Sequence, residues 1–146
     1  MAGSFRYLED IAFADAAFEA WGESLSELFE GSARAVIELM VNPLTVAPTR
    51  TYVVELTHAE VGELLFDWLS YIVMLKDTDA CVFHTASAEV SRSHATSQWS
   101  LRGTLDGEPI DHTRHELRSD VKAVTKHCFE VKQVSGRWIA KVVVDI

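Results

Sequence analysis

Residues 137–146, RWIAKVVVDI, form an apolar segment that predicts the last buried strand of a domain. Asp145 follows the three valines and stands beside Ile146, where the chain end brings a second carboxylate. Two carboxylates this close disfavour each other's ionisation. Either this end of the strand frays into water, or a positive group lies beside it.

The length of 146 residues predicts one domain, residues 1–146, with enough chain to bury a core. Charged residues make up 24% of the chain and hydrophobic residues 48%, which is typical of a soluble globular protein. The formal net charge of −9 argues against a protein that grips a phosphate backbone by itself. We therefore expect RNA contact only through a partner, and an acidic surface suited to metal cations or a basic protein.

No signal peptide and no apolar run of membrane-spanning length is visible, which predicts a cytoplasmic protein without a membrane contact. The two cysteines, Cys81 and Cys128, lack the CxxC spacing of a metal or redox motif. We expect both to be buried, reduced thiols.

Two strand–helix units follow one another in the first half of the chain. Residues 16–22 predict a strand, and Ser24 with Glu27 predicts a capping box that opens a helix ending before Asn42-Pro43. Residues 51–57 predict a second strand. Thr57 and Glu60 predict another capping box, followed by a helix that runs to about Lys76.

The chain after Asp79 has the alternation of β-strands. Residues 81–90 and 96–105 predict a hairpin across 91–94, and residues 106–109 predict a turn. Residues 121–134 and 137–146 predict a long final hairpin around Ser135-Gly136. Together these patterns predict an α+β fold in which two helices pack on antiparallel or mixed sheets.

Asp15 is the first candidate for chemistry, because it lies among small apolar residues just before a strand. Most aspartates at strand starts are turn formers, but an acid in such surroundings can also be a metal ligand or catalytic group. Asp10 is a more polar alternative.

Residues 107–128 hold a second group of candidates: His112, His115, Lys122 and His127. They lack the spacing of a zinc motif, and no phosphate-binding loop or nucleophile elbow occurs in the chain. Strand alternation places His127 with apolar neighbours, which favours a core histidine over a group in a cleft. The residues alone therefore name no function.

Several blocks, in order along nearly the whole chain, resemble the archease family. ADAAFEAWGESLSELFEGSARAVIELMV is similar to its N-terminal AD motif, strand and first helix, and LLFDWLSYIV is similar to its second helix. GEPIDHTRHELRSDVKAVTKHCFEV resembles its GE…H…IKAVTYH block, and VVVDI its ending. The resemblance implies a strand–helix–strand–strand type domain with an additional sheet.

The resemblance also implies a function. It implies a non-enzymatic accessory protein of the GTP-dependent RNA ligase that joins cyclic-phosphate or 3′-phosphate ends to 5′-hydroxyl ends, where it promotes guanylylation and multiple turnover in tRNA splicing or RNA repair. It implies a divalent-metal site at Asp15, Asp145 and Ile146, with calcium as the expected ion and magnesium and manganese as alternatives. Lys122 and His127 become candidates for the ligase-binding surface, with His115 behind them.

The chain departs from the family pattern at two positions. Ala12 stands where the family often has a histidine, and Lys126 replaces a tyrosine. Neither departure touches the three metal positions. Two other functions stay open at this point, a small metal-dependent hydrolase or phosphatase using Asp15, His127 and Asp145, and a chaperone-like structural adaptor.

Overall fold

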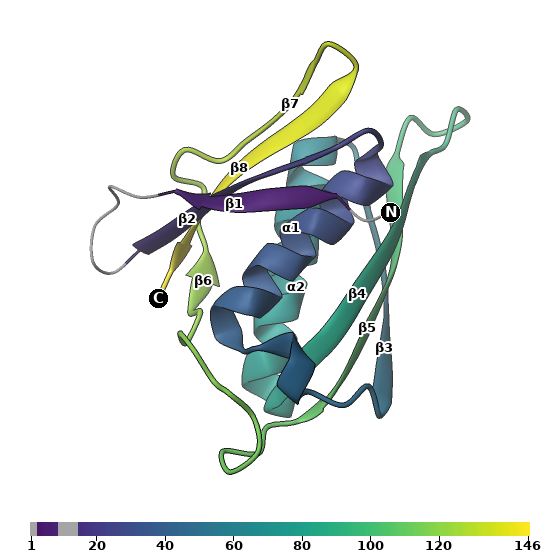
Figure 1. The fold of residues 1–146 in the computed structure, drawn as a ribbon. Helices are drawn as coiled ribbons and strands as arrows, with labels where there is room; N and C mark the ends of the chain where they lie inside the picture. Colours follow the sequence, from purple (N-terminus) through teal and green to yellow (C-terminus); the bar gives the residue numbers. More distant parts are fainter. Residues whose placement is uncertain (1–2, 9–14) are drawn as a thin grey trace.

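The protein is an α+β fold in which two helices lie between two antiparallel sheets, as the sequence predicts (Figure 1). The structure, a computed structural model, describes residues 3–8 and 15–146. Its helices are α1 (Leu25–Met40), the short 3-10 helix η1 (Pro43–Thr45) and α2 (Val61–Asp79). No helix in these residues is long and apolar enough to cross a membrane.

The larger sheet is built around β8 (Arg137–Asp145), which pairs with three other strands. On one side lies β2 (Asp15–Gly22), whose outer neighbour is β1 (Ser4–Leu8). On the other side lie β6 (Ala123–Val124) and β7 (Glu130–Val134), one after the other along the strand. The smaller sheet has the order β3-β5-β4, formed by Arg50–His58, Trp99–Pro109 and Cys81–Arg92.

The valines of β8 form part of the core, as their pattern predicts. Val142 and Val144 are fully buried against the helices, while Val143 faces the opposite side of the sheet and is still only 2% exposed. Across the molecule, the buried Trp68 of α2 donates its indole N–H to the carbonyl of Phe29. Gly103 of β5 lies beneath this ring. A side chain has no room there, because an added Cβ would come within 2.7 Å of the ring.

Side chains of α1 cover one edge of the smaller sheet. The hydroxyl of Ser26 accepts the N–H of Val90, and the carboxylate of Glu30 accepts the N–H of Ala88. These bonds satisfy main-chain donors of β4 on the side where, in the described part of the chain, it has no neighbouring strand. They also fix the position of α1 against that sheet.

The last turn of α1 is capped by a segment far along the chain. Residues 110–122 run from β5 to β6 and pass the end of α1. There the main-chain N–H groups of Arg118 and Ser119 donate to the carbonyls of Met40 and Leu39, and the Arg118 guanidinium donates to that of Glu38. We call residues 110–122 the strap.

The first predicted capping box is formed in part, and the second is not formed. Ser24 Oγ accepts the N–H of Glu27 at 3.2 Å, but the Glu27 carboxylate accepts the N–H of Glu23 rather than that of Ser24. At α2 the prediction was wrong, because β3 continues through His58 and holds Thr57 in the strand. The helix begins after Glu60, whose side chain makes no cap, and it continues to Asp79 rather than Lys76.

Two further expectations about the strands are corrected, and one strand was missed. Residues 106–109 are not a turn, because β4 pairs with β5 as far as Pro109. Residues 121–134 are not one strand, because the chain turns between β6 and β7 with Cys128 at a φ of 55°. The strand β1 was not predicted. The turn at Ser135-Gly136 is confirmed, and both residues have the positive φ of a type I′ hairpin turn.

The turn between β6 and β7 also overturns two predictions about side chains. His127 and Cys128 lie in it, and both are exposed rather than buried. The alternation that placed His127 with apolar residues does not hold where the strand is broken. Cys81 is a buried free thiol, as expected.

Two serines of α1 give opposite predictions for stability. Ser32 Oγ is buried and has no hydrogen-bond partner within residues 3–8 and 15–146, whereas Ser26 Oγ accepts the N–H of Val90. We expect Ser32→Ala to raise the free energy of unfolding by up to about 1 kcal/mol, and Ser26→Ala to lower it by about 1 kcal/mol. Urea denaturation measures both. A loss of stability in Ser32→Ala equal to that in Ser26→Ala would contradict the assignment of Ser32 as an unsatisfied group.

Candidate functional site

The pairing of β2 with β8 brings two of the predicted metal ligands together. In this antiparallel register Asp15 lies directly opposite Asp145, at the end of both strands. Opposed residues of such a pair have Cβ atoms about 4.5–5.5 Å apart, and like charges in that position are destabilising. Both side chains are partly buried, as is Ile146.

The main chain at Asp145 is held from both sides. Asp145 is paired with Asp15 of β2 and with Ala123 of β6, and its carbonyl accepts the N–H of Lys122 at 2.8 Å. The carbonyl of Val143 accepts both the N–H and the hydroxyl of Thr125. The end of β8 is therefore an ordered part of the sheet, and the two carboxylates have fixed backbones.

The donors at this place fit a hard cation. Within residues 3–8 and 15–146, neither Asp15 nor Asp145 forms an ion pair with a basic side chain, and no three side chains of the His, Cys, Asp and Glu types gather at one point. A metal here would have two carboxylates and a main-chain oxygen of Ile146, which is an all-oxygen set suited to Ca²⁺ or Mg²⁺. Asp10 and Ala12 lie outside the described residues.

The residues predicted to contact a partner do not form one cluster. We call Asp15 and Asp145 the acid pair. Lys122 is exposed and adjoins this pair through its main-chain bond to Asp145. His127 is exposed in the turn between β6 and β7, where its Nε2 lies 3.6 Å from the Cys128 Sγ. His115 has a fully buried side chain and belongs to a different group of residues, near η1 and the end of β5.

The turn that carries His127 is attached to α2. Lys126 Nζ binds both carboxylate oxygens of Glu63 and lies 4.3 Å from the centre of the Phe66 ring. Phe66 in turn packs edge-to-face against Phe129. The lysine that replaces the family's tyrosine therefore has a structural contact in this chain, and His127 is presented on a fixed turn.

A groove beside Lys122 was not foreseen from the sequence. It has a volume of about 370 Å³, lies between α2 and β6, and has Val73, Met74 and Val124 among its lining residues. Met74 is 42% exposed and contributes apolar surface to the groove. The helical pattern of α2 contained the signal, because its apolar residues cover more than the face that packs on the core.

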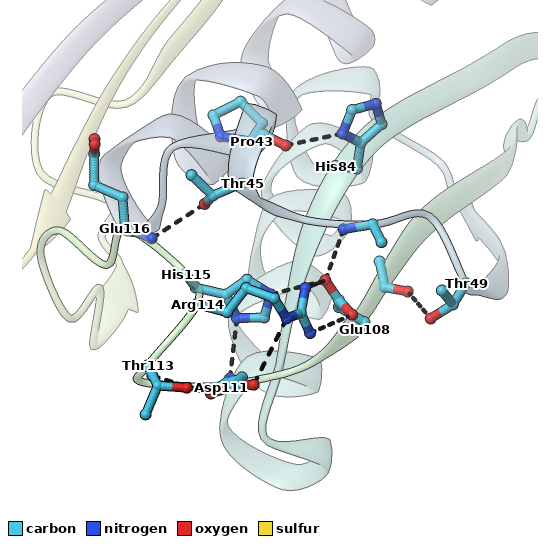
Figure 2. Close-up of polar contacts among 12 residues, drawn as sticks. Pro43, Thr45, Thr49, His84, Glu108, Asp111, Thr113, Arg114, His115 and Glu116 are labelled. Atoms are coloured by element: carbon cyan, nitrogen blue, oxygen red, sulfur yellow. Dashed lines mark hydrogen bonds and ion pairs between the residues drawn. The ribbon is translucent and has the colours of Figure 1, made fainter.

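The clearest polar cluster in the molecule surrounds Glu108 (Figure 2). This carboxylate is 6% exposed and lies at the end of β5. It accepts two hydrogen bonds from the Arg114 guanidinium, at 2.7 and 2.8 Å, one from the main-chain N–H of Ala47 and one from His115 Nε2 at 2.8 Å. Sequence reasoning missed Glu108 because it was assigned to a turn.

The contacts of His115 define its tautomer. Its Nδ1 accepts the main-chain N–H of Asp111 at 3.0 Å, so the proton is on Nε2, which donates to Glu108. Both ring nitrogens are therefore used by the protein itself. The Glu108 cluster ties the beginning of the strap to η1 and β5, and its geometry is that of a structural anchor.

The Glu108 cluster gives stability a pH dependence. Hydrogen bonds from Arg114, Ala47 and His115 hold the pKa of Glu108 well below its ordinary value of 4.5. A carboxyl with a lowered pKa in the folded state stabilises the fold above about pH 4.5, and this contribution is lost as the pH falls through and below that value.

We therefore expect Glu108→Gln to lower Tm by several degrees at pH 7, because a partner of Arg114 is removed at a buried site. The difference in Tm from the unmodified chain should shrink steadily as the pH is lowered from 5 towards 3. Thermal melts followed by circular dichroism at several pH values measure it. Glu116→Gln, an exposed carboxylate of the same strap, is the control and should change Tm little. A difference independent of pH would contradict the prediction.

Comparison with known proteins gives a consistent result. Residues 5–146 match the model of the Archease protein family. Protein archease of Methanopyrus kandleri is 35% identical over 133 residues, which cover 91% of this chain and 94% of that protein. Protein archease of Methanosarcina mazei is 33% identical over 142 residues, covering 97% and 95%.

Solved structures agree with the fold. The solution structure of Methanobacterium thermoautotrophicum protein 1598 has a TM-score of 0.81 and 33% sequence identity, and the match covers 98% of this chain and 99% of that one. The crystal structure of a Thermotoga maritima archease, described as a possible chaperone, has a TM-score of 0.62 at 18% identity, covering 95% and 97%. The latter supports the fold alone.

Proposed function

The chain belongs to the archease family, and we propose that it is an accessory protein of a GTP-dependent RNA ligase, which it activates by promoting guanylylation and repeated turnover. The observation that carries the proposal is the opposition of Asp15 and Asp145 across β2 and β8. In this proposal the chain performs no reaction of its own, and it reaches RNA through the ligase.

We propose that Asp15, Asp145 and an oxygen of Ile146 hold a divalent cation, with calcium favoured and magnesium or manganese as alternatives. When bound, the ion supplies positive charge that offsets the repulsion between the two carboxylates. The chain's own contribution is to fix the two acids by main-chain pairing and to place Lys122 next to them. Lys122 and the exposed His127 are the side chains that we assign to the ligase-binding surface, and His115 supports the strap from behind.

The arrangement of His127 favours this function over a metal-dependent hydrolase. A hydrolase using Asp15, His127 and Asp145 needs the three groups to converge on one point. In the described part of the chain these three side chains form no such group. His127 instead lies beside Cys128 on the turn between β6 and β7.

Calcium should stabilise the protein in the absence of any ligase. An ion that binds only the folded state at 100 times its Kd adds about 2.7 kcal/mol to the free energy of unfolding. We expect a rise in Tm on titration with Ca²⁺. Asp145→Asn should abolish the rise and, without metal, should be slightly more stable than the unmodified chain, because one member of the acid pair has lost its charge.

Asp106→Asn is the control, since Asp106 binds the hydroxyls of Thr51 and Thr85 on the smaller sheet. It should leave the calcium-induced rise unchanged. Equal titration curves for Asp145→Asn and the unmodified chain would remove Asp145 from the metal site. Parallel titrations with Mg²⁺ and Mn²⁺ identify the preferred ion.

The activator role is tested by following ligase guanylylation over time, with a cognate ligase and GTP, with and without this protein. We expect faster formation of the ligase–GMP adduct with the unmodified chain and loss of most of the stimulation with Asp15→Ala. Lys122→Glu should weaken stimulation while keeping the calcium-induced rise in Tm, because it alters the contact surface and not the metal ligands. No acceleration by the unmodified chain would contradict the proposed function. Full calcium stabilisation without stimulation would favour a structural adaptor.

A further inference from the structure

The face of the five-stranded sheet that points away from the helices, its outer face, carries a hollow that is distant from the acid pair. Its register aligns side chains in rungs across the strands that Figure 1 labels β1, β2, β8 and β7. Asp15 and Asp145 form the rung at one end. Six residues earlier on β8, about 20 Å away at 3.3 Å per residue, Ile139 lies between Trp21 and Lys132.

A hollow of about 350 Å³ lies over this second region. Its lining residues are Arg6, Glu19, Trp21, Arg137 and Ile139. The volume is in the range of roughly 300–1,000 Å³ that small-ligand sites occupy. The floor consists of a half-buried indole and an aliphatic side chain, and two guanidinium groups lie at its border.

The charge around the hollow differs from that of the whole chain. The net charge of the chain is −9, yet the three rungs nearest the Ser135-Gly136 turn carry four basic and two acidic side chains. The basic ones are Arg6, Lys132, Arg137 and Lys141, and the acidic ones are Glu19 and Glu130. These rungs therefore carry an excess of two positive charges on a chain that is acidic overall, and Glu23 and Glu27 line an adjoining hollow that shares Trp21 and Arg137. The excess favours an anion here over the rest of the surface.

The two arginines of the hollow are placed differently. Arg6 binds one oxygen of Glu19 through Nε and Nη2, at 2.8 and 2.6 Å, which neutralises the carboxylate inside the hollow and leaves Arg6 Nη1 free of it. Arg137 lies over the Trp21 ring, 6.0 Å from its centre, and has no carboxylate partner within residues 3–8 and 15–146. An exposed arginine beside an indole combines charge with a stacking surface.

From this geometry we propose that the Trp21 hollow binds one unpaired nucleotide. Its base stacks on the Trp21 indole in place of the exposed Arg137 guanidinium, and its phosphate is bound by Arg137 and Arg6. Stacking on an aromatic ring accepts any base, and guanidinium groups bind phosphate through paired N–H donors. The nucleotide can come from a single-stranded RNA end or be a free mononucleotide, since both present the same base and phosphate. A site for one nucleotide agrees with a chain too acidic to hold a long phosphate backbone.

A similar tryptophan–arginine pair elsewhere provides a matched control. Arg92 lies over the half-buried Trp99 ring at 5.2 Å, at the loop end of the β4–β5 hairpin. Trp99 does not line the hollow at Trp21. Substitutions at Trp99 and Arg92 therefore remove the same chemistry from a place where we propose no nucleotide site.

The experiment uses the isolated, ¹⁵N-labelled chain, whose four tryptophans give four indole N–H signals. AMP, adenosine, inorganic phosphate and a short single-stranded oligoadenylate are each titrated, the mononucleotide to roughly 10 mM, a range that includes millimolar Kd values. We expect AMP to shift the Trp21 signal in a saturable way and to leave that of Trp99 in place. Thermal melts confirm that each variant is folded.

Trp21→Leu should weaken AMP binding about tenfold or more, and the exposed Arg137→Gln about threefold or more. Trp99→Leu and Arg92→Gln should bind as the unmodified chain does. Tighter binding of the oligoadenylate than of AMP identifies an RNA end as the ligand, and equal binding identifies a free nucleotide. The proposal is overturned if AMP gives no saturable shift. It is also overturned if inorganic phosphate binds as tightly as AMP and Trp21→Leu has no effect on binding. Ligase guanylylation is not part of this readout, so the result is independent of the function proposed above.

Discussion

The pairing of β8 with β2, β6 and β7 is the interaction on which the rest of the structure depends. One nine-residue strand supplies the inner valines of the core, holds together every strand of the larger sheet except β1, and places Asp145 opposite Asp15. A slip of one residue would turn Val142 and Val144 away from the helices and Val143 towards them. The burial of the core therefore specifies the register that brings the two acids together.

The strength of the apolar pattern decided how far the sequence predicted this fold. Both helices and the central strands have long, regular patterns, and their existence and type were predicted correctly. The structure of residues 106–130 was not predicted correctly, because it depends on partners that are distant in the chain. Glu108 is in a strand because β4 continues opposite it, and His127 is exposed because the chain turns at Cys128.

The acid pair and the Glu108 cluster show the same difference in predictability. Resemblance to a family drew attention to Asp15 and Asp145, and the register explains why both are at the same end of the sheet. The bonds of Glu108 to Arg114, His115 and Ala47 join a strand, a loop and the segment after η1. No spacing in the sequence predicts that these residues come together. The Trp21 hollow likewise depends on which strands are neighbours, and residues 6, 21 and 137 are too far apart in the chain for any motif.

The capping of α1 by the strap has a consequence for synthesis of the chain. The carbonyls of Glu38, Leu39 and Met40 receive their hydrogen bonds from Arg118 and Ser119, about 80 residues downstream. At the usual rates of translation, on the order of 5–20 residues per second, the ribosome needs about 4–16 s to make that stretch. During this interval the last turn of the nascent helix has only water to bind these groups. The hydrogen bonding of its last turn is therefore completed only after most of the polypeptide has left the exit tunnel.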